Sequence, residues 1–346
     1  MKRAFLPASA ATIAFVLALR PAIAADPSWP PRLFAPYMFL GAGDDFKLTD
    51  GADACGLKHY TLAFVIARQD GRGPDTKYYP EPAWYGRVPV AQGLYVEQIN
   101  AIRQRGGDVF VSFGGEAGRE LAIVEENVGA LQAEYQAVID RYHFTWLDFD
   151  IEGANLDQHA SASRRRNTAL AALQTANPGL RVSFTLPVDP DGLSDASRAL
   201  LSDAKAKGVR VHSADLMVMY FGDKFTNKGK SEGELGIESA KAAYAQIQKI
   251  DPSIAVGLCP CLGRNGSGKE VFTVEDARTL KAFADATPWV CSLHYWSVNG
   301  DATGLRRKRR SGSANTNAVP AALDLPQPWA FANIFKSFTT VPQGSL

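Results

Sequence analysis

The sequence predicts an α/β fold, a (β/α)8 TIM barrel. Segments rich in β-branched and aromatic residues alternate along the chain with amphipathic segments, in which apolar residues recur at intervals of three and four. Strands separated by helices are parallel, because a parallel connection needs a crossover. Eight such units in about 320 residues fit a barrel. A doubly wound open sheet is the alternative, but no Gly-x-Gly-x-x-Gly follows the first strand.

The predicted elements fill most of the chain. The strands are residues 35–40, 59–67, 108–113, 145–150, 181–186, 215–221, 254–258 and 289–296. The intervening helices include residues 95–105, 120–142, 163–176, 194–207, 237–250 and 274–286. No linker rich in Pro, Ser or Gly divides the chain. We therefore expect a single barrel domain over residues 25–346.

The first 24 residues have the pattern of a signal peptide. Lys2 and Arg3 precede an apolar run, and Ala22-Ile23-Ala24 has the small-x-small form of a cleavage site. The apolar run is too short for a spanning helix, so we expect a secreted or periplasmic protein without a stable membrane anchor. An N-terminal anchor is the alternative.

Net charge gives no reason to expect a nucleic-acid partner. The formal charge is +1, and cleavage after Ala24 removes Lys2, Arg3 and Arg20 but no acid. The mature chain then has a charge of −2 (+1 − 3), which is close to neutral.

Four cysteines remain after cleavage: Cys55, Cys259, Cys261 and Cys291. Export permits disulfides, and a bond from Cys259 or Cys261 to Cys291 is possible if their strands are neighbours. A zinc site is the alternative, but the usual Cys-x-x-Cys spacing and a nearby His pair are missing. We predict no metal and no cofactor.

The fourth predicted strand carries a series of acids: Asp148, Asp150 and Glu152. Side chains alternate in a strand, so these three point the same way, roughly 6–7 Å apart in succession. Bulky apolar residues between them indicate burial, where packing alone explains acids poorly. Carboxyls desolvated together share protons, and at least one pKa rises, as a general acid requires. A divalent metal site and a solvent-facing acidic stripe are the alternatives.

Position along the strand predicts a division of roles. Catalytic groups of a TIM barrel lie at the C-terminal ends of its strands. Glu152 is at the end of the fourth strand, Asp150 is one pleat deeper and Asp148 is deeper still. We therefore expect Glu152 to reach the substrate, Asp150 to assist it and Asp148 to support Asp150.

These motifs resemble glycoside hydrolase family 18, in its bacterial chitinase branch. The family's fourth strand carries Asp-x-x-Asp-x-Asp-x-Glu, which the segment ending at Glu152 matches except at Thr145. Its third strand carries Ser-x-Gly-Gly, matched by residues 112–115, and its eighth carries a Trp, matched by Trp296. The resemblance spans roughly residues 35–301 and rests on three motifs in the right order.

Two positions depart from the family pattern. Thr145 replaces the deepest acid, which we expect to affect stability or pH tuning. The sixth strand of the family reads Met-x-Tyr-Asp or Met-x-Met-Asp-Tyr, whereas this chain has Met217-Val218-Met219-Tyr220-Phe221. Tyr220 is either the helper tyrosine or a replacement for the acid, and the sequence leaves the register open.

The resemblance implies retention of configuration by substrate assistance, in a family that is an exception to the two-carboxylate scheme. Glu152 would protonate the glycosidic oxygen, and the substrate's own 2-acetamido group would attack the anomeric carbon. Asp150 would orient that group, and Tyr220 would hydrogen-bond its oxygen. Together with Asp148 these are the predicted catalytic residues.

The predicted substrate-binding residues follow from the same motifs. Aromatic rings stack on sugar faces, so Trp296 is the expected floor and Tyr37 and Phe64 the expected walls. Small or flexible residues at strand ends and polar residues on loops complete the set: Ser112, Gly114, Gly115, Met217, Met219, Asp223 and Asn299.

The implied substrate is chitin or another oligosaccharide containing N-acetylglucosamine, cleaved at β-1,4 linkages by a monomer. A chitin-binding or lectin-like protein and an endo-acting N-glycan hydrolase are the alternatives. The altered sixth strand is compatible with a lectin-like protein, whereas the presence of both Asp150 and Glu152 argues against one. A metal-dependent hydrolase is more distant.

Overall fold

The computed structural model describes residues 29–41, 46–71, 73, 75–226, 229–265, 270–305 and 326–339. The predicted signal peptide, residues 1–24, lies outside the described residues. In the part of the chain that is described, no helix is both long enough and apolar enough to cross a membrane.

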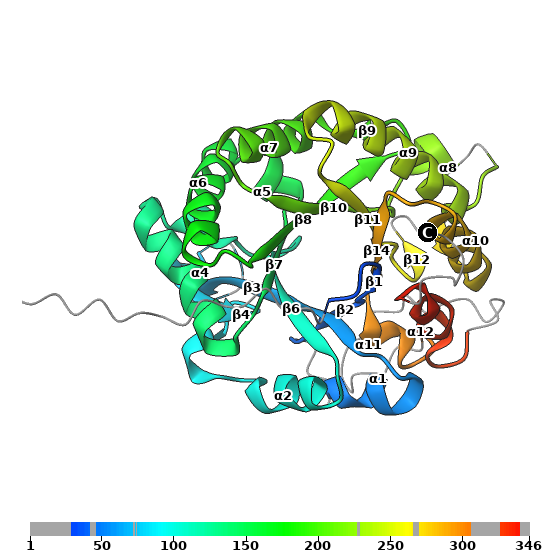
Figure 1. Cartoon of the computed structure of the whole chain (residues 1–346), viewed down its shortest axis with the longest axis horizontal. Coiled ribbons are helices and arrows are strands. Elements are labelled where there is room, and N and C mark those ends of the chain that lie inside the picture. The colour runs from blue at the N-terminus through cyan, green and yellow to red at the C-terminus, as the bar shows by residue number, and fades with distance from the viewer. Residues whose placement is uncertain are drawn as a thin grey trace, which may run out of the picture.

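The strands form the predicted barrel, a ring surrounded by helices (Figure 1). Its parallel strands are β1 (Leu33–Phe34), β2 (Tyr37–Phe39), β3 (His59–Gln69), β6 (Asp108–Gly114), β7 (Trp146–Asp150), β8 (Arg181–Asp189), β10 (Val211–Met217), β11 (Ala255–Leu258) and β14 (Val290–Leu293). β1 pairs with β14 and β2 pairs with β3, so the first strand closes the ring in two pieces. The prediction of a (β/α)8 barrel is confirmed.

The first strand is interrupted at Pro36, although the sequence predicted a continuous strand over residues 35–40. Proline has no N–H to give to a ladder. Its carbonyl accepts a hydrogen bond from the N–H of Thr61 on one side of the gap. The N–H of Ala35 and the N–H of Tyr37 donate to Leu293 and Tyr295 on the other side. The two short pieces thus bridge β3 and β14.

The sixth strand, β10, begins earlier and ends earlier than the predicted residues 215–221. After Met217 the N–H of Val218 donates to the carbonyls of Leu216 and Cys259, and Tyr220 adopts a φ of 55°. A left-handed residue cannot continue a strand. The apolar run continued past the strand end, which is why the sequence pattern misplaced it. β14 likewise covers only the first half of the predicted residues 289–296.

The helices form the outer layer, and the six that the sequence predicted lie near their predicted ranges. They are α1 (Leu48–Cys55), α2 (Val96–Gln104), α3 (Leu121–Val124), α4 (Val128–Tyr142), α5 (Gly153–Asp157), α6 (Ala160–Ala176), α7 (Asp195–Ala206), α8 (Asp223–Thr226), α9 (Glu232–Ile250), α10 (Val274–Asp285), α11 (Val298–Asp301) and α12 (Ala330–Phe335). The expected helix over residues 120–142 is two helices, because the Asn127 side chain caps α4 by accepting from the N–H of Ala130.

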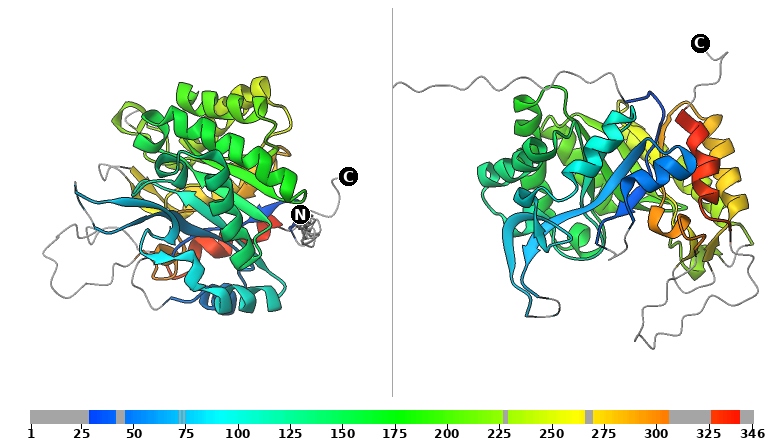
Figure 2. Two further views of the ribbon diagram at one scale, coloured as in Figure 1. Left: turned by 90° about the vertical axis from the view of Figure 1, so that its left-hand side faces the viewer. Right: turned by 90° about the horizontal axis from the view of Figure 1, so that it is seen from below.

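Short antiparallel strands extend the barrel at the rim. β4 (Tyr78–Trp84) and β5 (Val88–Pro89) pair beyond β3, and β9 (Gly192–Leu193) pairs with the end of β8. β12 (Gly263–Asn265) and β13 (Glu270–Phe272) form a separate hairpin. Figure 2 shows β3 and β4 projecting past the ring of helices. The sequence did not predict these additions.

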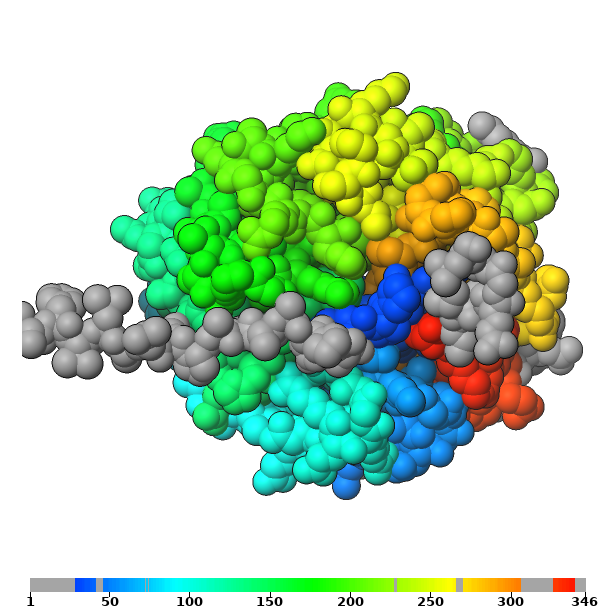
Figure 3. All heavy atoms as spheres, viewed as in Figure 1, coloured from blue at the N-terminus to red at the C-terminus, as the bar shows by residue number. Residues whose placement is uncertain are grey.

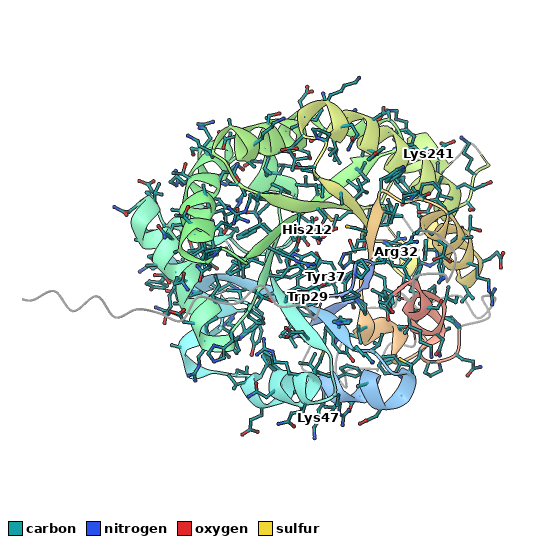
Figure 4. The ribbon with its side chains drawn as sticks, in the orientation of Figure 1. Trp29, Arg32, Tyr37, Lys47, His212 and Lys241 are labelled. Carbon is teal, nitrogen blue, oxygen red and sulfur yellow. The ribbon has the colours of Figure 1, made fainter. Side chains whose placement is uncertain are left out.

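Aromatic packing closes the N-terminal end of the barrel. The Trp29 ring lies 5.7 Å from Phe110 and 5.3 Å from Trp146, edge to face, and both tryptophans are buried. The Trp29 indole N–H donates to the Thr145 hydroxyl at 2.9 Å. The blue first strand lies near the centre of this face (Figure 3), and Trp29 and Tyr37 lie within the ring (Figure 4). Thr145 therefore belongs to the closed end.

All four cysteines are described and free, so the proposed bond to Cys291 is wrong for this structure. β11 and β14 are neighbours, as that pairing required. The side chains do not meet, because Cys259 packs with Tyr37 and Ala63 inside the barrel. The Cys291 thiol instead lies 3.7 Å from the hydroxyl of its neighbour Ser292.

Candidate active site

A cleft of about 890 Å³ opens at the C-terminal ends of the barrel strands. Eight of its lining residues are ones that the sequence predicted. They are Tyr37, Phe64, Asp150, Glu152, Met217, Met219, Tyr220 and Trp296. They come from the first, second, fourth, sixth and eighth barrel strands or from the residues that follow them. The fold thus gathers acids, thioethers and aromatic rings at one opening.

Asp148 lies below this cleft, fully enclosed, and its carboxylate is surrounded by hydroxyl donors. Tyr37 and Ser112 donate to Oδ2 at 2.9 Å and 2.6 Å. Ser183 and Thr185 donate to Oδ1 at 2.7 Å and 3.0 Å. Burial, followed by the charge of Asp215, raises the pKa of Asp148 to about 6. The donors suit an ionised carboxylate, which only accepts hydrogen bonds.

Asp150 is one pleat nearer the cleft and is only 5% exposed. Burial raises its pKa well above the ordinary range, and the charges of Glu152 and Asp148 raise it further. Its Oδ1 has no hydrogen-bond partner among the described residues. A side-chain hydrogen bond links it to Glu152. Two hydrogen-bonded carboxyls whose pKa values are both raised by burial can share one proton.

Glu152 follows the end of β7 and is half-buried, the most open of the three acids. Burial, followed by the charge of Glu116, raises its pKa to about 7. An ordinary glutamic acid has a pKa near about 4.3 and would be ionised at neutral pH. Glu152 can therefore carry a proton to the cleft near neutral pH, which is the property of a general acid.

Aromatic rings form the floor of the cleft around Trp296. Its ring is stacked on Phe64, with centroids 5.6 Å apart and planes at 19°, and lies 6.0 Å from Tyr37. The backbone of Trp296 is held by the segment after β11: its N–H donates to the Pro260 carbonyl, and its carbonyl accepts from the N–H of Leu262. The neighbouring rings and the backbone hydrogen bonds therefore hold the Trp296 ring in one orientation, which lowers the entropic cost of stacking a sugar on it.

The sixth-strand segment presents Met217, Met219 and Tyr220 to the cleft, whereas Phe221 is 4% exposed and turns into the core. Tyr220 is 56% exposed, and its hydroxyl lies 4.0 Å from the Cys261 sulfur. Burial of the hydroxyl and the charges of Cys261 and Glu116 raise its pKa, so it is a neutral donor at neutral pH.

The remaining predicted substrate-binding residues do not line the cleft. Ser112 supports Asp148 from below. A Cβ at Gly114 would lie 2.1 Å from the Asp150 carbonyl, and a Cβ at Gly115 would lie 2.7 Å from the Phe64 ring. These glycines let the third strand pack against the acid and the aromatic floor.

The two loop residues also lie apart from the lining. The Asn299 side chain is held by the Phe39 backbone: it accepts from the N–H at 2.9 Å and donates to the carbonyl at 3.1 Å. Asp223 begins α8 and is exposed to solvent outside the cleft lining.

Sequence reasoning missed three residues of the site. Ser183 and Thr185 hold Asp148, and Glu116 lines the cleft and raises the pKa of Glu152. Ser183 and Thr185 alternate with apolar residues within the predicted fifth strand, so their inward direction was readable. Glu116 directly follows the Ser-x-Gly-Gly segment, and its place beside Glu152 depends on loop geometry.

The described residues contain no group of three or more His, Cys, Asp or Glu side chains that could hold a metal ion. The oxygens of Asp148 are engaged by hydroxyl donors rather than free for coordination. The geometry instead supplies two carboxyls that share a proton beside an aromatic floor. It defines a hydrolase site built for general acid catalysis on a ring-shaped substrate.

A TIM barrel with an acid at the end of its fourth strand and a tryptophan floor defines a class of glycoside hydrolase. The chain is 30% identical to the catalytic domain of a hyperthermophilic chitinase from Pyrococcus furiosus, over 92% of this chain and 98% of that one, with a TM-score of 0.73. Mutants of active domain 2 of the Pyrococcus furiosus enzyme, including one set complexed with chito-oligosaccharides, give the same TM-score. The chain belongs to glycoside hydrolase family 18, as its motifs predicted.

Curated relatives agree with the structures. The chain is 31% identical over 269 residues to Endochitinase 11 of Metarhizium anisopliae, covering 73% of this chain and 49% of that protein. It is 29% identical over 341 residues to a probable bifunctional chitinase/lysozyme of Escherichia coli (strain K12), covering 90% and 35%. The chain thus spans about a third to a half of these relatives' length. No family model matches the chain.

Proposed function

We propose that the protein is a chitinase-like glycoside hydrolase that cleaves β-1,4 linkages between N-acetylglucosamine residues with retention of configuration. One observation carries the proposal. The acids in and just after β7 differ in exposure, from the enclosed Asp148 through Asp150 to Glu152, which lines a cleft floored by Trp296. Relatives named as chitinases over nearly the whole of this chain support the substrate class.

In the first step Glu152 donates its proton to the glycosidic oxygen, and the leaving sugar departs as an alcohol. The carbonyl oxygen of the substrate's 2-acetamido group attacks the anomeric carbon and forms an oxazolinium ion. Asp150 accepts a hydrogen bond from the acetamido N–H and stabilises the positive charge. The Tyr220 hydroxyl, which is a neutral donor, orients the acetamido oxygen.

In the second step the Glu152 carboxylate takes a proton from water, and the oxygen of that water attacks the anomeric carbon. The oxazolinium ring opens and restores the acetamido group, and Glu152 is again protonated. Two inversions at the anomeric carbon give net retention. The protein needs no nucleophile of its own, because the substrate supplies one.

Turnover of chromogenic chitobiose and chitotriose glycosides by the purified protein tests this proposal. Release of the chromophore together with N-acetylglucosamine oligomers is the expected result. Retained chitin binding without turnover would instead favour a lectin-like protein, which the altered sixth strand makes the second candidate. Turnover of N-glycans but not of chitin oligomers would favour the endo-acting glycan hydrolase.

The pH dependence should follow the protonation of Glu152. The active form carries a proton, and burial raises the pKa of this group to about 7, so kcat/KM is expected to fall as pH rises through about 7. Initial rates between pH 5 and 9 check this. Because Glu116 contributes to the raised pKa, Glu116→Gln should move the alkaline limb to lower pH. Constant kcat/KM up to pH 9 would contradict the role of Glu152.

Trp296→Ala should raise KM about tenfold, because a stacked aromatic ring contributes about 0.5–1.5 kcal/mol beyond its buried area. Trp289→Ala is the matched control. Trp289 stacks on Tyr244 of α9, with centroids 4.2 Å apart, and does not line the cleft. Equal KM values for the two variants, measured where both are folded, would show that Trp296 is not the sugar platform.

We further propose that the protein is exported and acts as a monomer in the periplasm or outside the cell. The pattern of residues 1–24 supports export. N-terminal sequencing of the mature protein and its mass by light scattering test the two statements.

A further inference from the structure

Two buried titratable side chains in the barrel have no part in the mechanism above. Asp215 on β10 and His294, just after β14, are each 1% exposed. His294 Nε2 lies 3.6 Å from Asp215 Oδ2, and the other Asp215 oxygen accepts a hydrogen bond from the Ser292 hydroxyl at 3.0 Å. A Cβ at Gly257 would lie 1.9 Å from Asp215 Oδ1, so that glycine leaves the space that the carboxylate fills.

The hydrogen bonds of His294 determine its protonation. Nδ1 lies 2.7 Å from the Ala35 carbonyl oxygen, which can only accept, so Nδ1 carries a proton. Thr61 Oγ1, at 3.4 Å from Nδ1, gives its own proton to the same carbonyl at 2.9 Å. If Nε2 were unprotonated, its lone pair would face a buried carboxylate. A proton on both ring nitrogens, which makes His294 a cation, replaces this repulsion with attraction across the 3.6 Å between Nε2 and Asp215 Oδ2.

This pair lies next to the catalytic acids. The strand register places Asp215 beside Thr185, and Thr185 beside Asp150. Thr185 also donates to Asp148. On the other side the His294 ring lies 6.0 Å from the ring of Tyr37, whose hydroxyl donates to Asp148. The pair thus touches the network around Asp148 from two directions.

We infer that Asp215 and His294 form a buried carboxylate–imidazolium pair that acts as a positioning element for the catalytic acids. The cation offsets the charge of Asp215, keeps Asp148 ionised and leaves the exchangeable proton to Asp150 and Glu152. The catalytic part of this inference rests on the proposed function, whereas the protonation of His294 does not.

Several titratable groups face the pair from the surrounding strands. They are Tyr37, Asp148, Asp150, His212, Cys259 and Cys291. Burial raises the pKa of the Cys259 thiol, and burial lowers the pKa of His212 to about 4, so both groups are neutral at pH 7. Asp148 is the group whose ionisation the cation most directly supports, because opposite charges attract more strongly where water is excluded.

The first test is nitrogen-15 NMR of the histidine rings in the whole protein at pH 7. His294 is expected to show two protonated ring nitrogens. Burial lowers the pKa of His59 and His212 to about 4, so they serve as internal controls with one protonated nitrogen each. A neutral His294 ring at pH 7 would overturn the inference, whatever the protein's activity.

The second test is the acid limb of kcat/KM for a chitotriose glycoside. His294→Gln leaves Asp215 without its cation, so the limb should move up by at least about one pH unit as Asp148 becomes easier to protonate. Asp215→Asn combined with His294→Gln restores the net charge of the site and should move the limb back toward wild type. An unmoved limb in His294→Gln, or no recovery in the double variant, would contradict the positioning role.

If His294→Gln does not fold, the stability of the double variant still tests the Asp215–His294 pair. The double variant has no unpaired buried charge and should fold, with a melting temperature above that of the single variant. Equal melting temperatures for the single and the double variant would show that Asp215 and His294 do not interact electrostatically.

Discussion

Glu152→Gln is expected to lower kcat on a chitotriose glycoside by at least about 10²-fold, since general acid catalysis contributes about 10²–10⁴-fold. Glutamine has nearly the same shape as glutamic acid but has no proton to donate. Glu152 is half-buried at the end of β7, and no hydrogen bond from it caps the following helix, so the fold should be retained. Initial rates with saturating substrate give kcat directly.

Glu116→Gln is the matched control, because it removes a carboxyl from the same cleft. It should shift the pH profile but keep kcat within about tenfold of wild type at the new optimum. Glu152→Gln should still bind chitin oligomers. Equal turnover by wild type and Glu152→Gln would disprove the assignment of the acid, and loss of turnover with chelators would support the metal reading instead.

Arg166→Met is expected to lower the free energy of unfolding by about 3–5 kcal/mol, since it leaves a buried carboxylate without its cation. Arg166 and Glu120 are 1% and 0% exposed, and Arg166 Nη1 lies 3.1 Å from Glu120 Oε2. The N–H of Ala122 and the Tyr135 hydroxyl also donate to Glu120. Neither can neutralise its charge. Urea unfolding followed by circular dichroism measures the loss.

The control for this change is Arg278→Met. Arg278 pairs with Glu275 at 3.0 Å on the surface of α10, where both side chains are largely exposed. An exposed pair contributes little, so the change should stay within about 0.5 kcal/mol. A similar loss in both variants would mean that burial is not what makes the Arg166–Glu120 pair important.

The barrel could be predicted from the sequence because alternation and helical periodicity act over whole elements. Strand ends could not, because local backbone geometry decides them. Pro36 divides the first strand, and the left-handed Tyr220 turns the chain out of the sixth. The apolar character of residues 218–221 continues through that turn, so composition alone gave no sign of it.

The acids of β7 could be predicted because period-two alternation assigns them to one face. The order of their burial could be predicted, but the hydrogen-bond partners and pKa values of the individual acids could not. Asp148 depends on Ser183 and Thr185 from β8, and the pKa of Glu152 depends on Glu116 from a loop. Such partners meet only when strands pair in register, which a single sequence does not state.

The contacts of the loop residues could not be predicted from the sequence either. Asn299 was predicted to bind sugar, and its amide is instead engaged by the Phe39 backbone, 260 positions away in the chain. Thr145 was expected to affect stability or pH tuning. Its hydroxyl accepts from Trp29 at the closed end of the barrel, so its effect on stability is the more direct of the two.

The most direct test of the central claim is the ratio of kcat/KM for two matched glycosides, one with N-acetylglucosamine and one with glucosamine at the cleaved linkage. A mechanism in which the acetamido group is the nucleophile predicts a ratio of at least about 10³, because a well-oriented internal nucleophile has a very large effective concentration. Comparable turnover of the two substrates would contradict it, and would point to a carboxylate of the protein, with Glu116 the one to examine.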